Sequence, residues 1–456
     1  MSISNRIILF SFLLIGLVIF SCNDEKSNYQ SVNQSAIEYQ IDSIVKPFIS
    51  DSLIAGTVVG VAHKGEVKLI KSYGFSDLNK KNSLEKNAVF PIASVSKTFT
   101  AIAIMQLVEK GQINLDDNIE KFIDFDTKGN VITVRELLNH TSGIKDYTES
   151  DIPSKLQKIG YSSENLLQLL EEKEFDFKPG EAMDYNNSGY YLLAIIIEKV
   201  SGLSYQQFLN DNIFQPVSMT STANCYSLTG NLIVNGYNLS REGNLNAAEV
   251  LDFQMATGAG SICSTVEDLL NWQIAFHKSN ELLEKNSYNT MITANKLQNG
   301  GFTKYGLGIE INQYNGNEVF SHNGVIEGYL SDMRYFPESD LIIVTLINTL
   351  GKIKPMNVSN TIADYFIQNK NVAKSYDGNI EELSGSYIGL VMGIKIQMSV
   401  FEENGKLFIE SRGNKFQIQF IGQNMWLAED GYTYTFIENK MQVNDPKVSI
   451  IFNKEE

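Results

Sequence analysis

The chain has 456 residues, and its hydrophobic content of 43% is ordinary for a globular protein with room for two or three domains. A formal net charge of -16, with no Lys/Arg-rich patch to offset it, argues against a nucleic-acid partner. With 3 cysteines, the sequence is not that of a disulfide-rich scaffold.

The N-terminal residues have the pattern of a secretory signal. One basic residue, Arg6, precedes an apolar run over residues 7–20, and Ser21 and Cys22 follow it. Because a membrane span needs about 20 apolar residues, we favour a signal peptide at residues 1–21 over a transmembrane helix. The sequence IFSC resembles a bacterial lipoprotein cleavage site, which implies that the exported protein is membrane-anchored in the cell envelope through a lipid on Cys22. The polar residues 22–35 are expected to form a flexible tether.

Two further cysteines, Cys225 and Cys263, lie in the body of the chain. Outside the cytoplasm they could form a disulfide bond. Small buried thiols are common in protein cores, however, and we expect free thiols at both positions.

Residues 36–370 mix strand and helix patterns. A β-hairpin is expected over residues 56–75, followed by a helix over residues 98–110 that is apolar nearly all the way round and therefore buried. Further on, the patterns predict three helices, then three strands and a last helix, at residues 133–143, 162–173, 188–202, 304–311, 328–336, 340–348 and 360–369. These patterns predict an α+β domain, in which an antiparallel sheet is flanked by helices and a helical subdomain is inserted.

The C-terminal residues read differently. After a polar linker at about residues 370–378, the segments 415–421 and 432–438 alternate apolar and polar residues, with short turns between them. This pattern predicts a separate all-β domain over residues 378–456, built as a small antiparallel barrel or sandwich. No catalytic constellation is evident in it, so we expect an accessory role that acylation does not require.

A serine three residues before a lysine is a candidate nucleophile with its base, because both side chains then project from the same face of a helix. The spacing occurs at four places, namely Ser43/Lys46, Ser83/Lys86, Ser94/Lys97 and Ser142/Lys145. Only Ser94 and Lys97 stand at the head of the buried helix, where burial lowers the pKa of an ammonium toward that of a general base. We therefore select Ser94.

Two more motifs follow along the chain. Tyr185 and Asn187 lie in a turn-rich loop before a helix, where a phenol can share a proton with a lysine and an amide can orient a carbonyl or that lysine. Their structural alternatives are a buried tyrosine and a helix cap. His322 and Gly324 lie on or beside a strand, against which a substrate backbone can pack. A lone histidine is more often structural.

In this order the three motifs resemble those of the serine β-lactamase and penicillin-binding-protein superfamily, and most closely its class C-like branch of D-alanyl-D-alanine carboxypeptidases and esterases. The resemblance spans about residues 36–369. It implies that Ser94 is acylated, Lys97 is its base, and Tyr185 shares the proton transfer. It also implies that Asn187 contacts the acyl group and that His322 and Gly324 line the cleft from an edge strand. The backbone N–H groups of Ser94 and of a residue near Gly324 would form the oxyanion hole.

His322 departs from the superfamily pattern, because the β-lactamases have lysine at this position. A histidine titrates near pH 6.5, so it would bind a substrate carboxylate only at lower pH. We therefore expect a cofactor-independent serine hydrolase with a small-molecule or peptide substrate, and we rank ester or peptide hydrolysis above β-lactam hydrolysis. The alternative is a non-catalytic envelope protein that keeps the fold for binding. The oligomeric state is left open.

Overall fold

The computed structural model describes residues 34–159, 161–228, 232–249, 252–298, 300–370, 372–391, 394–422, 424–428 and 431–455. The expected signal peptide, Cys22 and most of the tether lie outside these residues. Within the described ranges, no helix is long and apolar enough to cross a membrane.

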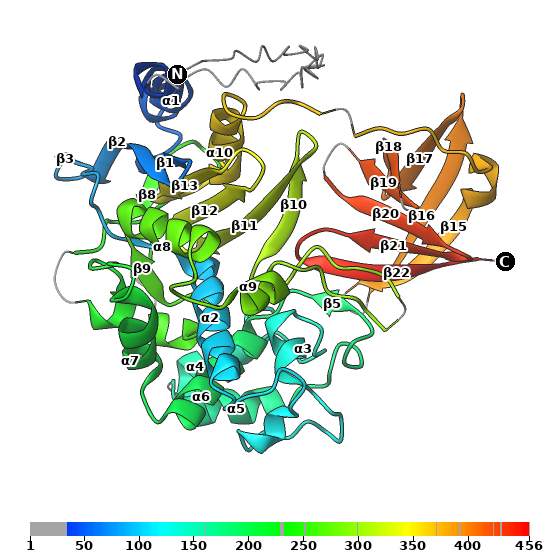
Figure 1. Ribbon diagram of the computed structural model, residues 1–456, viewed down its shortest axis with the longest axis horizontal. Helices are drawn as coiled ribbons and strands as arrows, with labels where there is room; N and C mark the ends of the chain where they lie inside the picture. The colour runs from blue at the N-terminus through cyan, green and yellow to red at the C-terminus, as the bar shows by residue number, and fades with distance from the viewer. Residues whose placement is uncertain are drawn as a thin grey trace, which may run out of the picture.

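A seven-stranded antiparallel sheet organises the larger domain (Figure 1). Its order is β10-β11-β12-β13-β1-β2-β3, so the N-terminal hairpin pairs with β13 from a segment almost 300 residues later. The sheet thus combines both ends of the domain, as the sequence predicts. Its strands are β1 (Gly56–His63), β2 (Glu66–Asp77), β3 (Asn82–Ser83), β10 (Glu310–Tyr314), β11 (Asn317–Ile326), β12 (Tyr329–Phe336) and β13 (Leu341–Ile347).

Helices cover both faces of this sheet because its central strands are apolar on both sides. In β1, Val59 and Val61 pack with α1 (Gln34–Ser50) and α10 (Pro355–Ala363), whereas Val58 and Ala62 belong to the core on the other face. That second core contains α2 (Ser96–Glu109) and α8 (Val266–Lys278). Every residue of α2 from Ser96 to Leu107 is buried, as expected for a helix that is apolar nearly all round.

The inserted helical subdomain lies below the sheet in Figure 1. It contains the three helices expected from periodicity, and α6 packs directly against α2. Its helices are α3 (Val134–Leu138), α4 (Ile152–Ile159), α5 (Ser163–Glu171), α6 (Asn187–Ser201) and α7 (Tyr205–Leu209), and α9 (Lys285–Met291) follows nearer the sheet. The last helix, α10, begins five residues earlier than expected because Pro355 fits the first turn of a helix.

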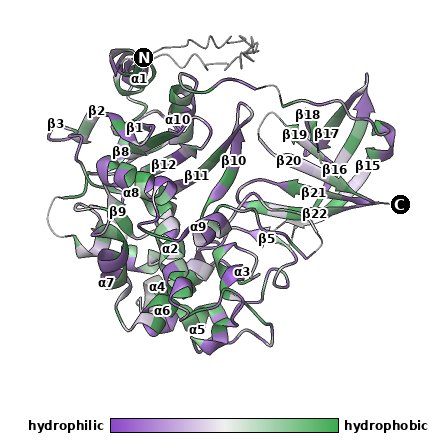
Figure 2. Cartoon of the chain, viewed as in Figure 1, coloured by the Kyte–Doolittle hydropathy of each residue, from purple (hydrophilic) through white to green (hydrophobic). Residues whose placement is uncertain are grey.

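The C-terminal domain is a closed antiparallel barrel, because β15 pairs with both β16 and β22. Its strands are β15 (Gly385–Val391), β16 (Ile394–Glu403), β17 (Lys406–Ser411), β18 (Asn414–Gly422), β19 (Met425–Ala428), β20 (Thr433–Ile437), β21 (Lys440–Asn444) and β22 (Val448–Lys454). Hydrophilic and hydrophobic residues both occur along these strands in Figure 2, as one buried face requires. The barrel therefore confirms the first of the two expected all-β forms.

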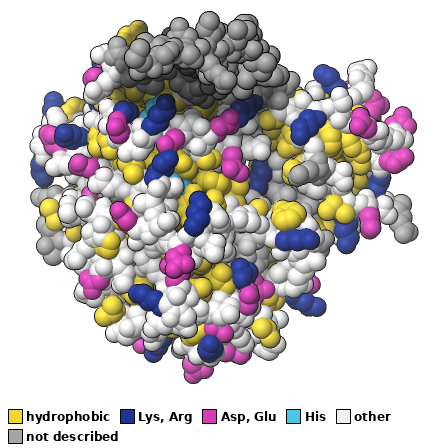
Figure 3. Space-filling model, viewed as in Figure 1, with side chains coloured by type: hydrophobic (Ala, Val, Ile, Leu, Met, Phe, Trp, Pro, Cys, Tyr) yellow, Lys and Arg dark blue, Asp and Glu magenta, His cyan; other side chains and the backbone are white. Residues whose placement is uncertain are grey.

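The barrel also pairs with the larger domain. The short strand β5 (Met183–Asp184) hydrogen-bonds to β22 at Val448 and Ser449. Because Tyr185 follows β5 directly, the barrel borders the segment that carries one of the candidate catalytic residues. On the face seen in Figure 3, acidic and basic side chains are interspersed over both domains.

Candidate active site

Ser94 lies in a single 3-10 turn, Ala93–Val95, immediately before α2. The preceding residue, Ala93, has φ of 47°, a left-handed conformation that side chains other than glycine rarely adopt. Ala93 is buried, whereas Ser94 is only half-buried. The chain thus holds a strained backbone at the point where the serine hydroxyl is presented, as is common at functional sites.

Lys97, one turn into α2, is fully buried and directs its ammonium nitrogen toward Ser94. Lys97 Nζ lies 3.3 Å from Ser94 Oγ, 2.7 Å from Asn187 Oδ1 and 2.9 Å from the carbonyl oxygen of Ala259. Burial lowers the pKa of Lys97 to about 7, although the nearby Asp146 carboxylate acts in the opposite direction. A substantial fraction of Lys97 is therefore neutral at neutral pH, as a general base must be.

The other three Ser-x-x-Lys pairs lack this environment. Lys46 forms an exposed ion pair with Asp42, and Lys145 forms one with Asp176 at 2.8 Å. Ser83 and Lys86 are both exposed. Ser94 is distinguished by the buried helix that follows it, which is the criterion the sequence provides.

Tyr185 completes the group around Ser94. Its ring centroid lies 4.6 Å from Lys97 Nζ. Its buried hydroxyl interacts with the Ser94 hydroxyl, but the geometry falls short of an ordinary hydrogen bond. Burial raises the pKa of Tyr185 well above its usual value, so the free protein holds it as a neutral phenol. In this state the phenol has a proton to donate.

Asn187 contacts the lysine from the first turn of α6. Its Oδ1 accepts from Lys97, while its backbone N–H and its Nδ2 donate to Asp146 Oδ2 at 2.5 and 3.0 Å. The neighbouring Asn186 caps α6, since its side chain accepts from the backbone N–H of Gly189. Asp146 carries no motif signal in the sequence, yet it determines which way the amide of Asn187 faces.

His322 lies in the same cluster but differs from the expectation of a titrating, substrate-facing cation. It is fully buried, its Nδ1 donates to the carbonyl oxygen of Asn323 at 2.8 Å, and its Nε2 lies 2.9 Å from Tyr305 Oη. Because a carbonyl only accepts, Nε2 must be the acceptor from Tyr305. Burial lowers the pKa of His322 to about 3, with the Lys97 charge acting in the same direction. The histidine is therefore neutral at physiological pH.

Gly324 has a packing role in addition to the expected place beside the cleft, which stays a prediction. A Cβ atom at this position would lie 2.4 Å from the carbonyl oxygen of Ile92 and 2.3 Å from Ser331 Oγ. The glycine thus allows β11 to pack against the residues just before Ser94. The edge strand of the sheet is β10, but it pairs only with Asn317–Ser321, so β11 is free of β10 from His322 onward. Oxyanion-hole donors at Ser94 and near Gly324 stay a prediction.

His140, which belongs to none of the three sequence motifs, packs against Tyr185. Its ring centroid is 4.4 Å from that of Tyr185, 5.1 Å from Tyr190 and 4.7 Å from Tyr305. Its Nδ1 accepts from the backbone N–H of Asn186. Burial keeps the pKa of His140 well below its usual value, so this ring adds a neutral wall to the site.

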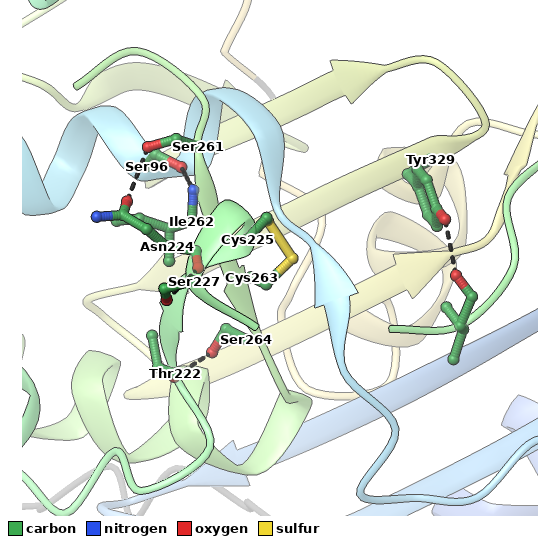
Figure 4. The surroundings of a disulfide bond; sticks show 11 residues. Ser96, Thr222, Asn224, Cys225, Ser227, Ser261, Ile262, Cys263, Ser264 and Tyr329 are labelled. Carbon is green, nitrogen blue, oxygen red and sulfur yellow. Dashed lines mark hydrogen bonds between the residues drawn. A yellow bond between two sulfur atoms is a disulfide. The ribbon is translucent and has the colours of Figure 1, made fainter. Parts of the chain in front are cut away.

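A disulfide bond joins Cys225 and Cys263, which corrects the expectation of free thiols (Figure 4). Strand β6 (Ala223–Asn224) pairs with strand β9 (Ile262–Ser264), and Ala223 is opposite Cys263. This pairing brings Cys225, which directly follows β6, close to Cys263. The segment that leads into β9 supplies the Ala259 carbonyl to Lys97, and Ser96 Oγ accepts from the backbone N–H of Ile262. The disulfide therefore ties the segment that contacts Ser96 and Lys97 to the neighbouring strand β6.

One cavity of the structure lies away from this site. A cavity of about 530 Å³ is lined by Gly111, Asn114 and Arg135, among others, beyond the C-terminal end of α2. Ser94 precedes the opposite end of that helix, about 20 Å away along its axis.

Comparison with known proteins agrees with this geometry. Residues 41–364 match the family described as Beta-lactamase, and the chain belongs to this family. It is 31% identical to penicillin-binding protein 4* of Bacillus subtilis over 307 residues, which cover 63% of this chain and 67% of the relative.

Solved structures show the same fold. D-amino acid amidase from Ochrobactrum anthropi is similar with a TM-score of 0.65 and 23% identity, over 72% of this chain and 98% of the amidase. The octameric penicillin-binding protein homologue from Pyrococcus abyssi is similar with a TM-score of 0.63 and 23% identity, over 91% of this chain and 99% of the homologue. The second likeness extends beyond the larger domain into the barrel.

Proposed function

We propose that this protein is a serine hydrolase that transfers the acyl group of an ester or amide to Ser94 and then to water. The family consists typically of serine hydrolases. The observation that carries the proposal for this chain is the contact of the half-buried Ser94 with a buried lysine whose pKa is lowered to about 7.

The first chemical step follows from the contacts of Lys97. A neutral amine has two N–H bonds and one lone pair. With the N–H bonds donated to Asn187 Oδ1 and the Ala259 carbonyl, the lone pair is left for the proton of Ser94. The Ser94 oxygen then attacks the substrate carbonyl carbon, and the carbonyl electron pair moves to its oxygen.

The leaving group then needs a proton. Tyr185 is placed to pass one from Lys97, because its phenol is neutral and lies beside both Ser94 and the lysine. The carbon–oxygen or carbon–nitrogen bond to the leaving group breaks, and the acyl group remains on Ser94. Water attacks this ester in the second half of the reaction, with Lys97 again accepting the proton.

The nature of His322 limits the substrate. A neutral histidine cannot provide the permanent cation that lysine supplies at this position in β-lactamases. We therefore infer that ester or peptide hydrolysis, on a small molecule or a peptide, is favoured over β-lactam hydrolysis.

We also propose that the protein is exported and anchored through a lipid on Cys22. The support is the apolar run before Cys22 and the resemblance of IFSC to a lipoprotein cleavage site. Cys22→Ser should release the processed protein from the membrane fraction. If it stays unprocessed in the membrane, the N-terminal segment is a membrane span instead.

A fluorophosphonate probe tests the catalytic proposal, with the labelled residue located by mass spectrometry. The probe should label Ser94, and Ser94→Ala should abolish both labelling and hydrolysis of a p-nitrophenyl ester. Ser83→Ala is the matched control, because Ser83 belongs to an exposed Ser-x-x-Lys pair, and it should leave both unchanged. A folded wild-type protein that neither reacts nor hydrolyses esters would identify a binding protein.

A further inference from the structure

The turn between β21 and β22 of the barrel ends at the active site. Asp445 fixes the turn, since its Oδ1 accepts from the backbone N–H groups of Lys447 and Val448 at 2.6 and 2.8 Å. The carbonyl oxygen of Lys447 then accepts from the backbone N–H of Tyr185 at 2.9 Å. The position of Lys447 is thus set from both sides, and its backbone touches a residue of the catalytic cluster.

The side chain of Lys447 extends over the same residue. Its ammonium nitrogen lies 5.4 Å from the centroid of the Tyr185 ring, while Lys97 Nζ lies 4.6 Å from that centroid. Lys447 is exposed, and its ammonium forms no ion pair with a carboxylate of the described residues. A solvent-accessible cation therefore stands beside the phenol that borders the nucleophile.

The charge of Lys447 reaches deep into the site. It lowers the pKa of Lys97, His140 and His322, although burial is the larger cause at each of them. It also acts on the buried carboxylate of Glu310. Burial raises the pKa of Glu310, and the Lys447 charge acts in the opposite direction. These four groups surround the cluster, so the field of the barrel lysine covers the place where a substrate would bind.

Other cations near the site are not available to a substrate anion. Lys97 must be neutral to act as a base, and His322 is neutral because it is buried. Arg334 is buried and donates to Asp332 at 2.8 Å and to Asn360 at 2.8 Å. The nearby carboxylate of Glu310 accepts a hydrogen bond of 3.0 Å from Asn323 Nδ2.

We propose that Lys447 forms an anion subsite of the active site and binds a carboxylate on the leaving group of the substrate. The inference rests on the proposed function, because it uses the acylation of Ser94. It assigns the cation to the barrel domain, whereas His322 stands at the position where β-lactamases have lysine. It also replaces the expectation that the barrel is accessory. The substrate class is an ester or amide whose leaving group is anionic, such as a peptide with a free C-terminal carboxylate.

The carboxylate is assigned to the leaving group because of Tyr185. In the proposed reaction this phenol passes a proton to the departing atom, so the departing part of the substrate lies on its side. The Lys447 ammonium lies over the ring of this same tyrosine. An anion carried by the leaving group is therefore nearer to Lys447 than one carried at the far end of the acyl group.

Two esters with the same acyl group test the subsite. One has a 3-carboxyphenyl leaving group, and the other has the neutral 3-carbamoylphenyl group of nearly the same size. The measured quantity is the ratio of kcat/KM for the anionic ester to that for the neutral ester, in wild type, Lys447→Gln and Lys447→Arg. Lys440→Gln is the control, because Lys440 is an exposed lysine at the other end of β21.

Lys447→Gln should lower this ratio about fivefold, as expected for a partly exposed ion pair, whereas Lys447→Arg and Lys440→Gln should keep it. Added salt should lower the ratio in wild type and have little effect on it in Lys447→Gln. Turnover of both esters with the same ratio in wild type and Lys447→Gln would overturn the subsite alone. Turnover of neither ester by wild type would overturn the proposed function, and the subsite with it.

Discussion

One carboxylate oxygen of Asp146 accepts two hydrogen bonds from Asn187, one from the backbone N–H and one from the side-chain Nδ2. Because Nδ2 donates to Asp146, the Asn187 amide presents its oxygen, not its nitrogen, to Lys97. An aspartate outside the three motifs thus orients the amide that accepts from Lys97, the proposed base.

Asp146→Asn should therefore impair acylation while the fold persists. Asparagine has only one acceptor oxygen, whereas Thr148 donates to one oxygen of Asp146 and Asn187 donates to the other. When the new NH2 group faces Asn187, the Asn187 amide turns and Lys97 loses its partner. Because a general base contributes about 10²- to 10⁴-fold, we expect a loss of at least about tenfold in kcat/KM on a neutral ester. Asp176→Asn, which removes only the ion pair with Lys145, should have no such effect.

The rate of acylation should depend on pH through Lys97. Its pKa is lowered to about 7, so it is protonated and inactive as a base below that pH and active above it. The kcat/KM of a neutral ester should rise about tenfold per pH unit below pH 7 and level off above it. Asp184 also has a pKa raised by burial to about 7, so the profile is repeated with Asp184→Asn. A flat profile between pH 5 and 7 in both proteins would contradict the role of Lys97.

His322 should remain neutral throughout this range. With a pKa lowered to about 3, it is expected to keep its proton on Nδ1 and none on Nε2. Nitrogen-15 NMR of the 4 histidines, with His322→Gln for assignment, should show this tautomer without titration between pH 5 and 8.5. Titration near pH 6.5 would restore the expectation drawn from the sequence.

The hydrogen bond from Tyr305 should stabilise this tautomer. Tyr305→Phe leaves a buried Nε2 without a donor and should lower the free energy of unfolding by about 1–3 kcal/mol. Tyr288→Phe removes a similar contact with His277 away from the site and should lower stability without changing the acylation rate.

The disulfide should be measurable by counting thiols. In a Cys22→Ser background, the denatured and unreduced protein should contain no free thiol. Replacing Cys225 and Cys263 by alanine opens a link over 38 residues and should cost about 2–4 kcal/mol of stability. It should also lower the acylation rate, because the Ala259 carbonyl that binds Lys97 leads into the fastened strand. Two free thiols in the unreduced protein would restore the original expectation.

The sequence predicted the parts of this molecule that depend on local pattern. Ser94 and Lys97 could be selected because the twelve consecutive buried positions of α2 are, apart from Lys97 and Gln106, apolar or small residues. The barrel could be predicted because apolar and polar residues alternate along its strands. The state of His322 could not be predicted, since its ring packs against Tyr185 and Tyr305, which other segments of the chain supply. The disulfide was missed because only the pairing of β6 with β9 brings the cysteines together. Lys447 was missed because β5 and β22 are far apart in the chain.

The pairing of β5 with β22 also has an evolutionary consequence. Under the proposed role of Lys447, the cation of the site belongs to a second domain, so we expect the residue at position 322 and the barrel to be selected together. Relatives that carry lysine at the position of His322 would be free to lose the barrel or to vary at position 447. Relatives that carry histidine there would be expected to keep both the barrel and a basic residue on its β21–β22 turn. We therefore expect positions 322 and 447 to vary together across the family.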